Sequence, residues 1–146
     1  MYAVAQSIHI KRPVEDVFKV VHNLPALPDW FVGVEKWEPI GSAHASVGDR
    51  YWVLLKVGAI AAGGEVAVTE VTEPTSIAWE SRRGTKHRAR FTLESEDGGC
   101  RARIELAFEL SGAVSSRITE LISGGMVRRS LAATLEQLRH HCEFEI

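Results

Sequence analysis

Three residues in the central third of the chain could move a proton or hold a polar ligand: Tyr51, Ser81 and His87. An imidazole titrates near neutral pH and can act as a general acid or base, and the hydroxyl groups of tyrosine and serine can orient a polar substituent. A core histidine with satisfied hydrogen bonds, and a tyrosine at a cavity rim, are the competing interpretations of His87 and Tyr51. The elements that carry these residues decide between the two interpretations.

Other reactive residues lack the spacing of a metal or cofactor site. His140 and His141 are adjacent, so their imidazoles would diverge around a helix and are better placed to interact with its C-terminal dipole. Cys100 and Cys142 lie far apart with no Cys-x-x-Cys spacing, which favours two free thiols. The sequence contains no phosphate-binding loop, dinucleotide fingerprint, nucleophile elbow or zinc-binding His-Glu motif. We therefore expect neither a metal nor a cofactor.

Composition and charge narrow the classes of function. The chain of 146 residues has 17 Lys and Arg against 19 Asp and Glu, and this formal charge of -2 argues against a nucleic-acid partner. With 45% hydrophobic and 25% charged residues, we expect one globular domain over 1–146. No secretory signal or membrane-spanning run is present in the sequence, so the expectation is a cytoplasmic monomer or weak homodimer without an integral membrane segment.

The N-terminal third predicts a strand followed by two short helices. Residues 3–10 are strand-like, and Pro13 is suited to the first position of a helix whose apolar residues recur at helical spacing. Asn23 with Pro25 ends this helix, and 24–30 predicts a second short helical turn. Glycines and prolines then separate strand-like runs as far as residue 110, which indicates an antiparallel meander.

Opposite charges fix the register of the later strands. If 85–95 folds back on 100–110, the pairs Glu94 with Arg101, Arg90 with Glu105 and Lys86 with Glu109 all coincide. This register turns the charges to solvent and the other parity inward, as does Glu80 facing Arg88 in the preceding hairpin. The inward residues are then Ile77, Trp79, Ser81, Thr85, His87, Ala89, Phe91, Leu93, Cys100, Ala102, Ile104, Leu106, Phe108 and Leu110.

Two neighbouring strands are less clearly defined. In 50–57 the charged Arg50 and Lys56 suggest that Tyr51, Val53 and Leu55 face inward. For 64–72 two faces remain open, one with Glu65, Ala67, Thr69 and Val71 and the other with Val66, Val68 and Glu70.

A local basic run has two interpretations. The residues Arg82, Arg83, Lys86, Arg88 and Arg90 could attract nucleic acid or an anionic membrane. We expect instead that Glu80, Glu105 and Glu109 on neighbouring strands neutralise most of this charge, leaving a solvated and self-paired sheet face.

The last thirty residues predict a long helix with Ser115 or Ser116 as its cap. Its apolar residues lie on one face in the first half of the helix and on another face in the second half. The change of face, a break in the helical pattern, falls at Gly124-Gly125, where the glycine pair could produce a kink, a close backbone approach or a flexible point. The first face carries Ile118, Leu121, Ile122 and Met126, and the second carries Val127, Leu131, Leu135, Leu138 and Cys142.

The order of these elements, together with particular residues, resembles the polyketide cyclase/dehydrase and lipid-transport family of START-like, helix-grip proteins. The resemblance covers nearly the whole chain. It is carried by Ile8-His9-Ile10, Pro13, Val17, Phe18, Leu27-Pro28-Asp29-Trp30, Val47-Gly48, Val66, Glu70-Val71, Glu73-Pro74, Ile77, Trp79, Gly98-Gly99, Leu135, Leu138 and Glu143. Asn23, in place of an acidic residue, and Cys100, in place of a threonine, depart from the family pattern.

The resemblance implies an α+β helix-grip fold, in which a curved antiparallel sheet of about seven strands wraps around the C-terminal helix, with two short helices after the first strand. It also implies an elongated apolar cavity between sheet and helix. With the inferred facing, the candidate ligand-binding residues are Trp30, Tyr51, Val53, Leu55, Trp79, Ser81, His87, Ala89, Phe91, Leu106, Phe108, Ile118, Leu121, Ile122 and Met126. The candidate catalytic residues are His87 and Tyr51.

Three functions are compatible with this interpretation. The first is reversible binding of a hydrophobic small molecule such as a lipid, isoprenoid or polyketide. The second is a polyketide cyclase, aromatase or dehydratase in which the cavity folds the substrate and His87, helped by Tyr51, moves a proton. The third is a toxin-like role with a protein partner, which predicts an exposed apolar patch on the sheet edge or near Trp37.

Overall fold

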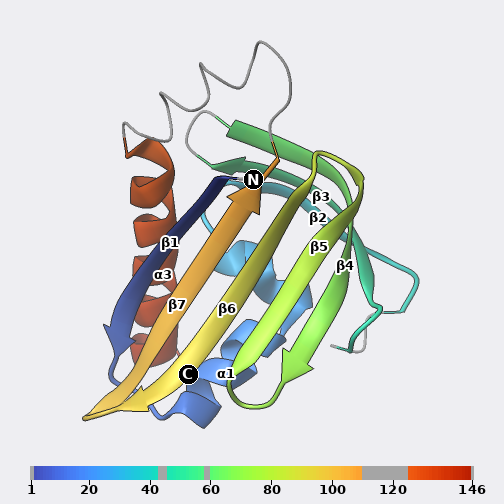
Figure 1. The fold of residues 1–146 in the computed structure, drawn as a ribbon. Helices are drawn as coiled ribbons and strands as arrows, with labels where there is room; N and C mark the ends of the chain where they lie inside the picture. The colour runs from blue at the N-terminus through green and yellow to red at the C-terminus, as the bar shows by residue number, and fades with distance from the viewer. Residues whose placement is uncertain (1, 43–45, 58–59, 110–124, 146) are drawn as a thin grey trace.

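The computed structural model describes residues 2–42, 46–57, 60–109 and 125–145. Within these residues the chain forms seven strands, two α-helices and one short 3₁₀ helix (Figure 1). In chain order they are β1 (Tyr2–Ile10), α1 (Val14–His22), η1 (Leu24–Asp29), β2 (Val34–Ile40), β3 (Arg50–Val57), β4 (Ile60–Thr72), β5 (Ser76–Gly84), β6 (His87–Glu96), β7 (Gly99–Phe108) and α3 (Met126–Phe144).

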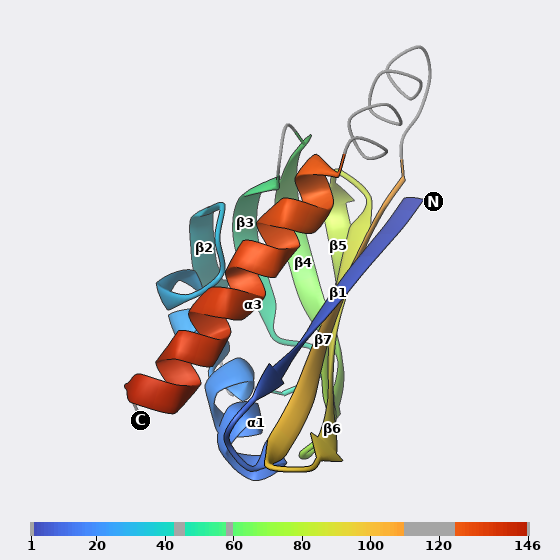
Figure 2. The same ribbon diagram turned by 90° about the vertical axis from the view of Figure 1, so that its left-hand side faces the viewer.

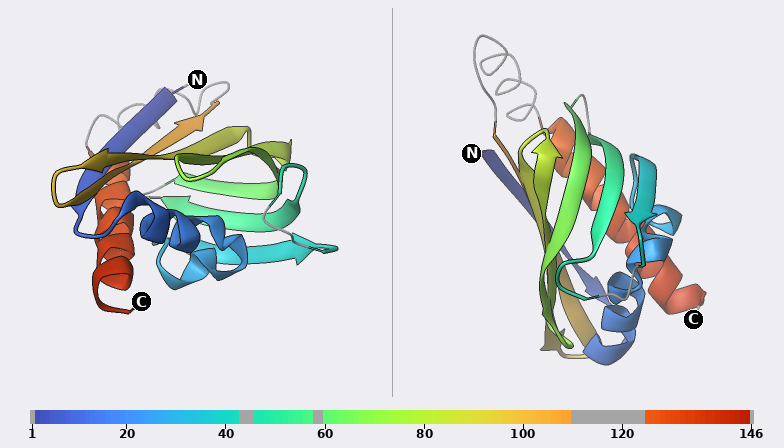
Figure 3. Two further views of the ribbon diagram at one scale, coloured as in Figure 1. Left: turned by 90° about the horizontal axis from the view of Figure 1, so that it is seen from below. Right: turned by 90° about the vertical axis from the view of Figure 1, so that its right-hand side faces the viewer.

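The seven strands form one antiparallel sheet in the order β1-β7-β6-β5-β4-β3-β2. The sheet is curved, and α1, η1 and α3 all lie on its concave side (Figures 2 and 3). Every strand after β2 pairs with the strand that precedes it, whereas β1 joins the far edge of the sheet beside β7. This arrangement confirms the predicted α+β helix-grip fold.

The helix α1 forms because its apolar residues recur at helical spacing. Val14, Val17, Phe18 and Val21 are buried on one side, while Glu15 and Asp16 lie in the first turn, where acidic residues favour the helix dipole. Pro13 is the residue that precedes the helix rather than its first member, and Asn23 follows its last residue. The short η1 continues directly and buries Leu24 and Leu27.

The predicted register of β6 and β7 is confirmed. Arg90 is paired with Glu105 and Glu94 with Arg101, so His87 lies opposite Phe108. The alternate residues of both strands are buried, as the charge pattern predicted. Inward facing of Tyr51, Val53 and Leu55 in β3 is confirmed in the same way, since all three are buried.

The strand β4 combines parts of both predicted faces. Its pairing with β5 shifts between Glu65 and Val66 and again between Val68 and Glu70, which marks two irregularities of the bulge type. Val66 and Val68 belong to the core, and past the second shift it is Val71 that packs against the core. A strict alternation could not describe this strand, because each extra residue reverses the facing of those that follow.

Close backbone contact also shapes β4 and β5. Gly64 has φ +132°, and a Cβ at this position would overlap the carbonyl of Arg83 on β5. Only glycine combines this backbone conformation with so close an approach. Gly64 therefore allows the sheet to bend at the first irregularity.

The helix α3 begins immediately after Gly125, whose φ of +82° is left-handed. Gly125 of the predicted break thus lies directly before the start of this helix, and Gly124 falls outside the described residues. Its buried residues include the predicted second face, namely Val127, Leu131, Leu135, Leu138 and Cys142, and also Thr134. The predicted cap at Ser115 or Ser116 lies outside the described residues.

Candidate functional site

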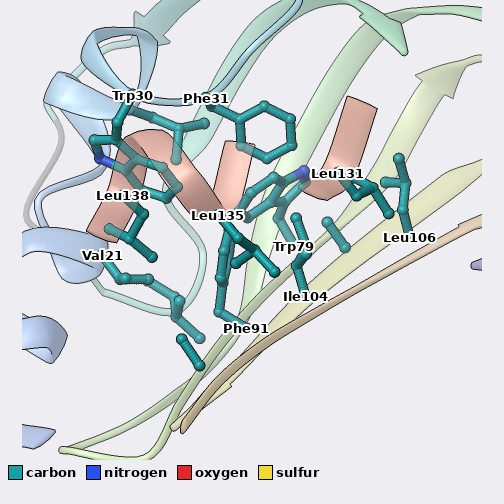
Figure 4. Packing of buried hydrophobic residues seen from close by; sticks show 14 of the residues in the cluster. Val21, Trp30, Phe31, Trp79, Phe91, Ile104, Leu106, Leu131, Leu135 and Leu138 are labelled. Carbon is teal, nitrogen blue, oxygen red and sulfur yellow. The ribbon is translucent and has the colours of Figure 1, made fainter. Parts of the chain in front are cut away.

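Six aromatic rings form a continuous cluster on the concave face of the sheet. Trp79 of β5 contacts Trp37 at 5.3 Å, Phe91 at 6.1 Å and Phe31 at 6.4 Å between ring centroids. The cluster extends from Phe91 to Trp30 at 5.4 Å and from Trp37 to Tyr51 at 4.8 Å. Figure 4 shows four of the six, Trp30, Phe31, Trp79 and Phe91, beside the leucines of α3. Of these six residues, Trp30, Tyr51, Trp79 and Phe91 were candidate ligand-binding residues from the sequence.

Tyr51 lies fully buried at one side of this cluster, with its ring stacked on Trp37. Its hydroxyl has no hydrogen-bond partner within the described part of the chain. Burial, reinforced by the nearby carboxylate of Asp49, raises the pKa of Tyr51 to about 12. The phenol therefore stays protonated at neutral pH and can donate a hydrogen bond to a ligand.

His87 is buried, with 2% of its surface exposed, and is held at the start of β6 by two hydrogen bonds. Its backbone N–H donates to Oγ of Ser81 at 3.0 Å, and Nδ1–H donates to the carbonyl of Thr85 at 2.9 Å. Burial lowers the pKa of His87, and the bond to Thr85 opposes this shift in part. The imidazole is therefore neutral at physiological pH, with its proton on Nδ1.

This tautomer gives Nε2 of His87 an available lone pair. Nδ1 is bonded back to the β5–β6 turn, and Nε2, the other ring nitrogen, is buried. No group in residues 2–42, 46–57, 60–109 or 125–145 hydrogen-bonds to this atom. A ligand hydroxyl could donate to Nε2, or Nε2 could accept a proton during a reaction.

Two tryptophans add unpaired donors. The indole N–H groups of Trp30 and Trp79 are buried and lack a partner among the described residues. In Figure 4 the nitrogen of Trp79 points toward Leu131 of α3, whereas that of Trp30 lies on the side of its ring away from Phe31 and Trp79. Trp79 is therefore a donor beneath α3, whereas the indole nitrogen of Trp30 points away from Phe31 and Trp79.

The pairing of the strands sets the spacing of the polar atoms. Tyr51 is paired with Val66 and Val66 with Ser81, whose hydroxyl binds His87. Tyr51 and His87 thus lie in one row across β3, β4, β5 and β6, with about 14 Å between their backbones at the usual strand spacing. They do not hydrogen-bond to each other. A direct proton exchange between them is excluded, but one elongated ligand could contact both.

The remaining predicted lining residues of the sheet are apolar and buried. They come from β3, β6 and β7, and each has 3% or less of its surface exposed and belongs to the core cluster beneath α3. These residues are Val53, Leu55, Ala89, Phe91, Leu106 and Phe108. These residues therefore form a wide apolar core beneath α3 that contains a few unpaired polar atoms.

The structure describes only one of the four residues that were predicted on the first apolar face of the C-terminal helix. Met126 is the first residue of α3 and is 36% exposed, so its side chain lies at the surface. Ile118, Leu121 and Ile122 fall outside the described residues. The helical residues that do face the sheet belong to the second predicted face, with Leu131, Leu135 and Leu138 buried against it (Figure 4).

Phe31 and Trp37 were missed as candidate residues. Phe31 directly follows Trp30, and the consecutive apolar residues of 30–32 were a signal that more than one ring enters the core. Trp37 was considered as part of an exposed patch, but it is only 8% exposed and its indole N–H donates to the carbonyl of Leu24 at 2.8 Å. Trp37 itself therefore belongs to the core and not to an exposed patch.

A surface groove of about 510 Å³ lies outside the aromatic cluster, beside α1, η1 and the end of α3. Its rim carries charges of both signs, including Lys19 and Asp29, and Trp30 contributes to its wall. The two cysteines are buried, and burial raises the pKa of Cys100 to about 11 and that of Cys142 to about 12. Both thiols are therefore protonated and unreactive at neutral pH.

The histidines near the C-terminus take part in local contacts. His141 is 3.2 Å from the carboxylate of Glu145, and the ring of His140 packs on Phe144. In the part of the chain that the structure describes, no three His, Cys, Asp or Glu side chains are grouped so that they could hold a metal ion. Among its helices, none combines the length and apolar character that a membrane crossing requires.

The curved sheet closed by a C-terminal helix defines a START-like, helix-grip protein. A model of the family "Polyketide cyclase / dehydrase and lipid transport" matches residues 1–143. The chain belongs to this family. Comparison of the sequence with curated proteins finds no match.

Solved structures agree on the fold. A protein from Thermus thermophilus shares 15% identity at a TM-score of 0.78, with 97% of each chain covered. A START superfamily protein from Mycobacterium smegmatis shares 14% at 0.75, with 100% of each chain covered. The Zhui aromatase/cyclase from a Streptomyces species shares 13% at 0.72, covering 97% of this chain and 93% of that one. At such identities these likenesses show the fold alone.

Proposed function

We propose that this protein binds an apolar small molecule with oxygen substituents on the inner face of its sheet, beneath α3. The observation that carries the proposal is the set of three unpaired polar atoms on that face, namely the hydroxyl of Tyr51, Nε1 of Trp79 and Nε2 of His87. Leaving a buried polar group without a partner costs about 1–3 kcal/mol. A ligand that satisfies these groups recovers this cost.

The chemical character of the ligand follows from these atoms. Tyr51 and Trp79 donate hydrogen bonds and Nε2 of His87 accepts one, so the ligand should combine carbonyl or ether oxygens with a hydroxyl group. Among the residues that the structure describes, the buried ionisable side chains are those of His87, which is neutral, Tyr51, Cys100, Cys142 and Glu65. The carboxylate of Glu65 lies 3.6 Å from the guanidinium of Arg50. Within the described ranges the inner face thus offers no cation to a carboxylate or phosphate, and a neutral ligand is favoured.

Affinity would come mainly from burial of apolar area, with the polar atoms selecting the ligand. Removing about 300 Å² of apolar ligand surface from water is worth roughly 7 kcal/mol before the cost of association. An oxygenated polyketide or isoprenoid meets both requirements better than a plain hydrocarbon chain. Membership of a family described by polyketide cyclisation and lipid transport supports this ligand class.

Mass spectrometry under native conditions tests the proposal. The protein, purified without detergent from its expression host, should carry a bound neutral molecule, which organic extraction then identifies. Substitution His87→Gln together with Tyr51→Phe should reduce the amount retained. A wild-type protein that carries no small molecule and takes none up from a lipid extract would contradict the proposal.

Cyclisation or dehydration of a polyketide is a second candidate, favoured by the state of His87. Its Nε2 is unprotonated, buried and unpaired, and its lowered pKa keeps it a neutral base at physiological pH. Nε2 would remove a proton from a carbon between two ketones of a bound chain, and the resulting enolate carbon would attack a third ketone. The new alkoxide would then take back the proton from the imidazolium.

The geometry gives Tyr51 a separate role in this reaction. Since Tyr51 lies in the same row as His87 but two strands beyond Ser81, its hydroxyl would hold a carbonyl at the far end of the folded chain. Its pKa of about 12 keeps the phenol protonated and suits it to donation. Tyr51 would therefore position the substrate and would not exchange its proton with His87.

Turnover of a synthetic linear poly-β-ketone tests the second candidate. The variant His87→Ala should lose about two to four orders of magnitude in rate, the usual contribution of general acid–base catalysis. Binding of the chain, followed by tryptophan fluorescence, should change far less. Equal turnover by His87→Ala and wild type would remove His87 from proton transfer and leave the binding function.

A further inference from the structure

The turn between β5 and β6 opens into a hollow on the surface. Paired residues of the two strands end at Glu80 and Arg88, and beyond this pair the chain bounds a depression of about 300 Å³. The depression is lined by Glu80, Ser81, Arg82, Arg83, Gly84, Lys86, His87 and Arg88. Four of these eight residues are cations and one is an anion.

The cations of this hollow are less neutralised than the sequence suggested. Arg82, Arg83 and Arg88 are exposed, and none lies within ion-pair distance of a carboxylate in the described ranges. Lys86 is 3.8 Å from Glu109, at the limit of an ion pair. The expectation that carboxylates of neighbouring strands neutralise these cations is therefore only partly confirmed.

Pairing elsewhere on the face explains this excess of charge. Arg90 pairs with Glu70 of β4 at 3.0 Å, and Glu105 is occupied by Arg103 of its own strand at 3.3 Å. Of the acidic residues that were expected to neutralise the basic run, Glu105 thus pairs with Arg103 instead, and only Glu109 approaches a cation of the hollow, Lys86. The β5–β6 turn is left with its positive charge exposed to solvent.

Apolar and further basic residues gather at the same end of the molecule. The start of α3, the start of β1 and the β5–β6 turn all lie at the upper end of the molecule in Figure 1 and Figure 2, spread across the width of the sheet in Figure 1. Met126 is 36% exposed and Tyr2 is 37% exposed. Tyr2 of β1 is paired with Phe108 of β7, and Phe108 is paired with His87 of β6. Tyr2 therefore lies in the same row across the sheet as His87, next to the β5–β6 turn. Arg128 adds an exposed cation on the first turn of α3.

We propose that this end of the molecule docks on an anionic membrane surface, with lipid phosphates facing Arg82, Arg83 and Arg88 and the side chains of Tyr2 and Met126 entering the interfacial layer. A tyrosine and a methionine exposed among cations suit the boundary between headgroups and acyl chains. An acidic protein would require the cations but not the apolar side chains. The proposal stands apart from the ligand on the inner face and does not depend on it.

The distribution of charge over the molecule determines which end of the protein faces the membrane. The whole chain carries a formal charge of -2, so a uniform attraction to anionic lipid is excluded. Each arginine or lysine near an anionic surface contributes about fivefold in binding. This attraction acts over a Debye length of about 8 Å at physiological salt, so only the end that carries the excess of cations is drawn to the lipid.

Co-sedimentation of the whole chain with vesicles tests the proposal. The protein should bind vesicles of equal parts phosphatidylcholine and phosphatidylglycerol, but not vesicles of phosphatidylcholine alone, and high salt should release it. The triple variant Arg82→Gln, Arg83→Gln, Arg88→Gln should bind about 100-fold more weakly, as expected from three charges near the surface. Tyr2→Ser with Met126→Ser should weaken binding while leaving its dependence on salt unchanged.

A matched control removes the same charge elsewhere. Lys11, Lys19 and Lys36 are exposed and lie on other parts of the fold, and their combined replacement by glutamine should leave vesicle binding unchanged. Equal loss in both triple variants would overturn a localised site. So would binding of wild type to poly-glutamate or inorganic phosphate in the absence of any binding to anionic vesicles. Ligand uptake in vesicle-free solution is measured separately, so failure of docking leaves the proposed function untouched.

Discussion

The hydroxyl of Ser81 accepts a hydrogen bond of 3.0 Å from the backbone N–H of His87. This bond joins β5 to β6 one residue past the last paired position of the two strands. It replaces a ladder hydrogen bond with a side-chain contact and fixes the backbone from which the imidazole projects. The position of Nε2 inside the molecule therefore depends on a serine of the neighbouring strand.

Replacing Ser81 by alanine tests this dependence. In Ser81→Ala the N–H of His87 loses its partner in a half-buried position, and the free energy of unfolding should fall by about 1–2 kcal/mol. Urea denaturation measures the loss. Ser81→Thr, which keeps a hydroxyl, should recover most of the stability, and an alanine variant as stable as wild type would show that the bond is not formed.

Stability should depend on pH through His87. Its pKa is lower in the folded chain than the ordinary value of 6.5, so the unfolded chain binds a proton first as the pH falls. The free energy of unfolding should be greatest above this value and decrease as the pH falls below it, by at most about 1.4 kcal/mol per pH unit for one group.

Urea denaturation of wild type and of His87→Gln at a series of pH values between 8 and 5.5 gives this contribution as the difference between the two proteins, and Glu70 and Glu96, whose pKa values are lowered from 4.5, titrate below that range. His87→Gln should lessen the decrease. An NMR titration in which the His87 ring protonates at or above its ordinary pKa would refute the assignment of a neutral, buried imidazole.

Removing the hydroxyl of Tyr51 should separate stability from binding. Without a ligand, Tyr51→Phe deletes a buried group that has no partner among the described residues, so the variant should be as stable as wild type or more stable by about 1 kcal/mol. With an oxygenated ligand present, wild type should gain more in melting temperature than the variant. A variant that is destabilised without ligand would indicate that the hydroxyl has a structural role.

The bend between β4 and β5 should not tolerate a side chain at Gly64. A Cβ there would overlap the carbonyl of Arg83, and the backbone φ of +132° is unfavourable for any other residue. Gly64→Ala should therefore lower the free energy of unfolding by more than about 2 kcal/mol, a loss typical of backbone strain. Gly48→Ala is an instructive comparison, since φ is also positive there but its Cβ would meet no atom within 4 Å. An equal loss in both variants would point to conformation alone.

The sequence predicted the fold and the facing of most strands because charge and hydrophobicity alternate strictly in β6 and β7. Three opposite-charge pairs in one register left little freedom, and they placed His87 inside. The prediction failed where the alternation is interrupted. Two irregularities in β4 change its facing, and another between Val34 and Lys36 puts Trp37, three residues after Val34, into the core.

The unpaired polar atoms could not be predicted in the same way. Whether the nitrogen of Trp79 finds an acceptor depends on rotamers and on the residues of α3 above it, which strand periodicity does not describe. The ion pair of Arg90 was likewise not predicted, since Arg90 pairs with Glu70 of β4, across the intervening β5, and not with Glu105 of the neighbouring β7. The register can be predicted from the sequence, but the choice among several neighbours of similar distance requires coordinates.

Binding of two closely matched aromatic probes tests the central claim most directly. Para,para-dihydroxybiphenyl is neutral at pH 7 and carries a hydroxyl at each far end, so it can reach toward both Tyr51 and His87, while biphenyl has the same apolar body and no oxygen. Titration followed by tryptophan fluorescence should show at least about tenfold tighter binding of the dihydroxy compound, equivalent to one net hydrogen bond. The double variant Tyr51→Phe, His87→Gln should bind both probes alike. Equal affinity of wild type for the two probes, or a preference that survives in the double variant, would contradict the claim that these buried groups select the ligand.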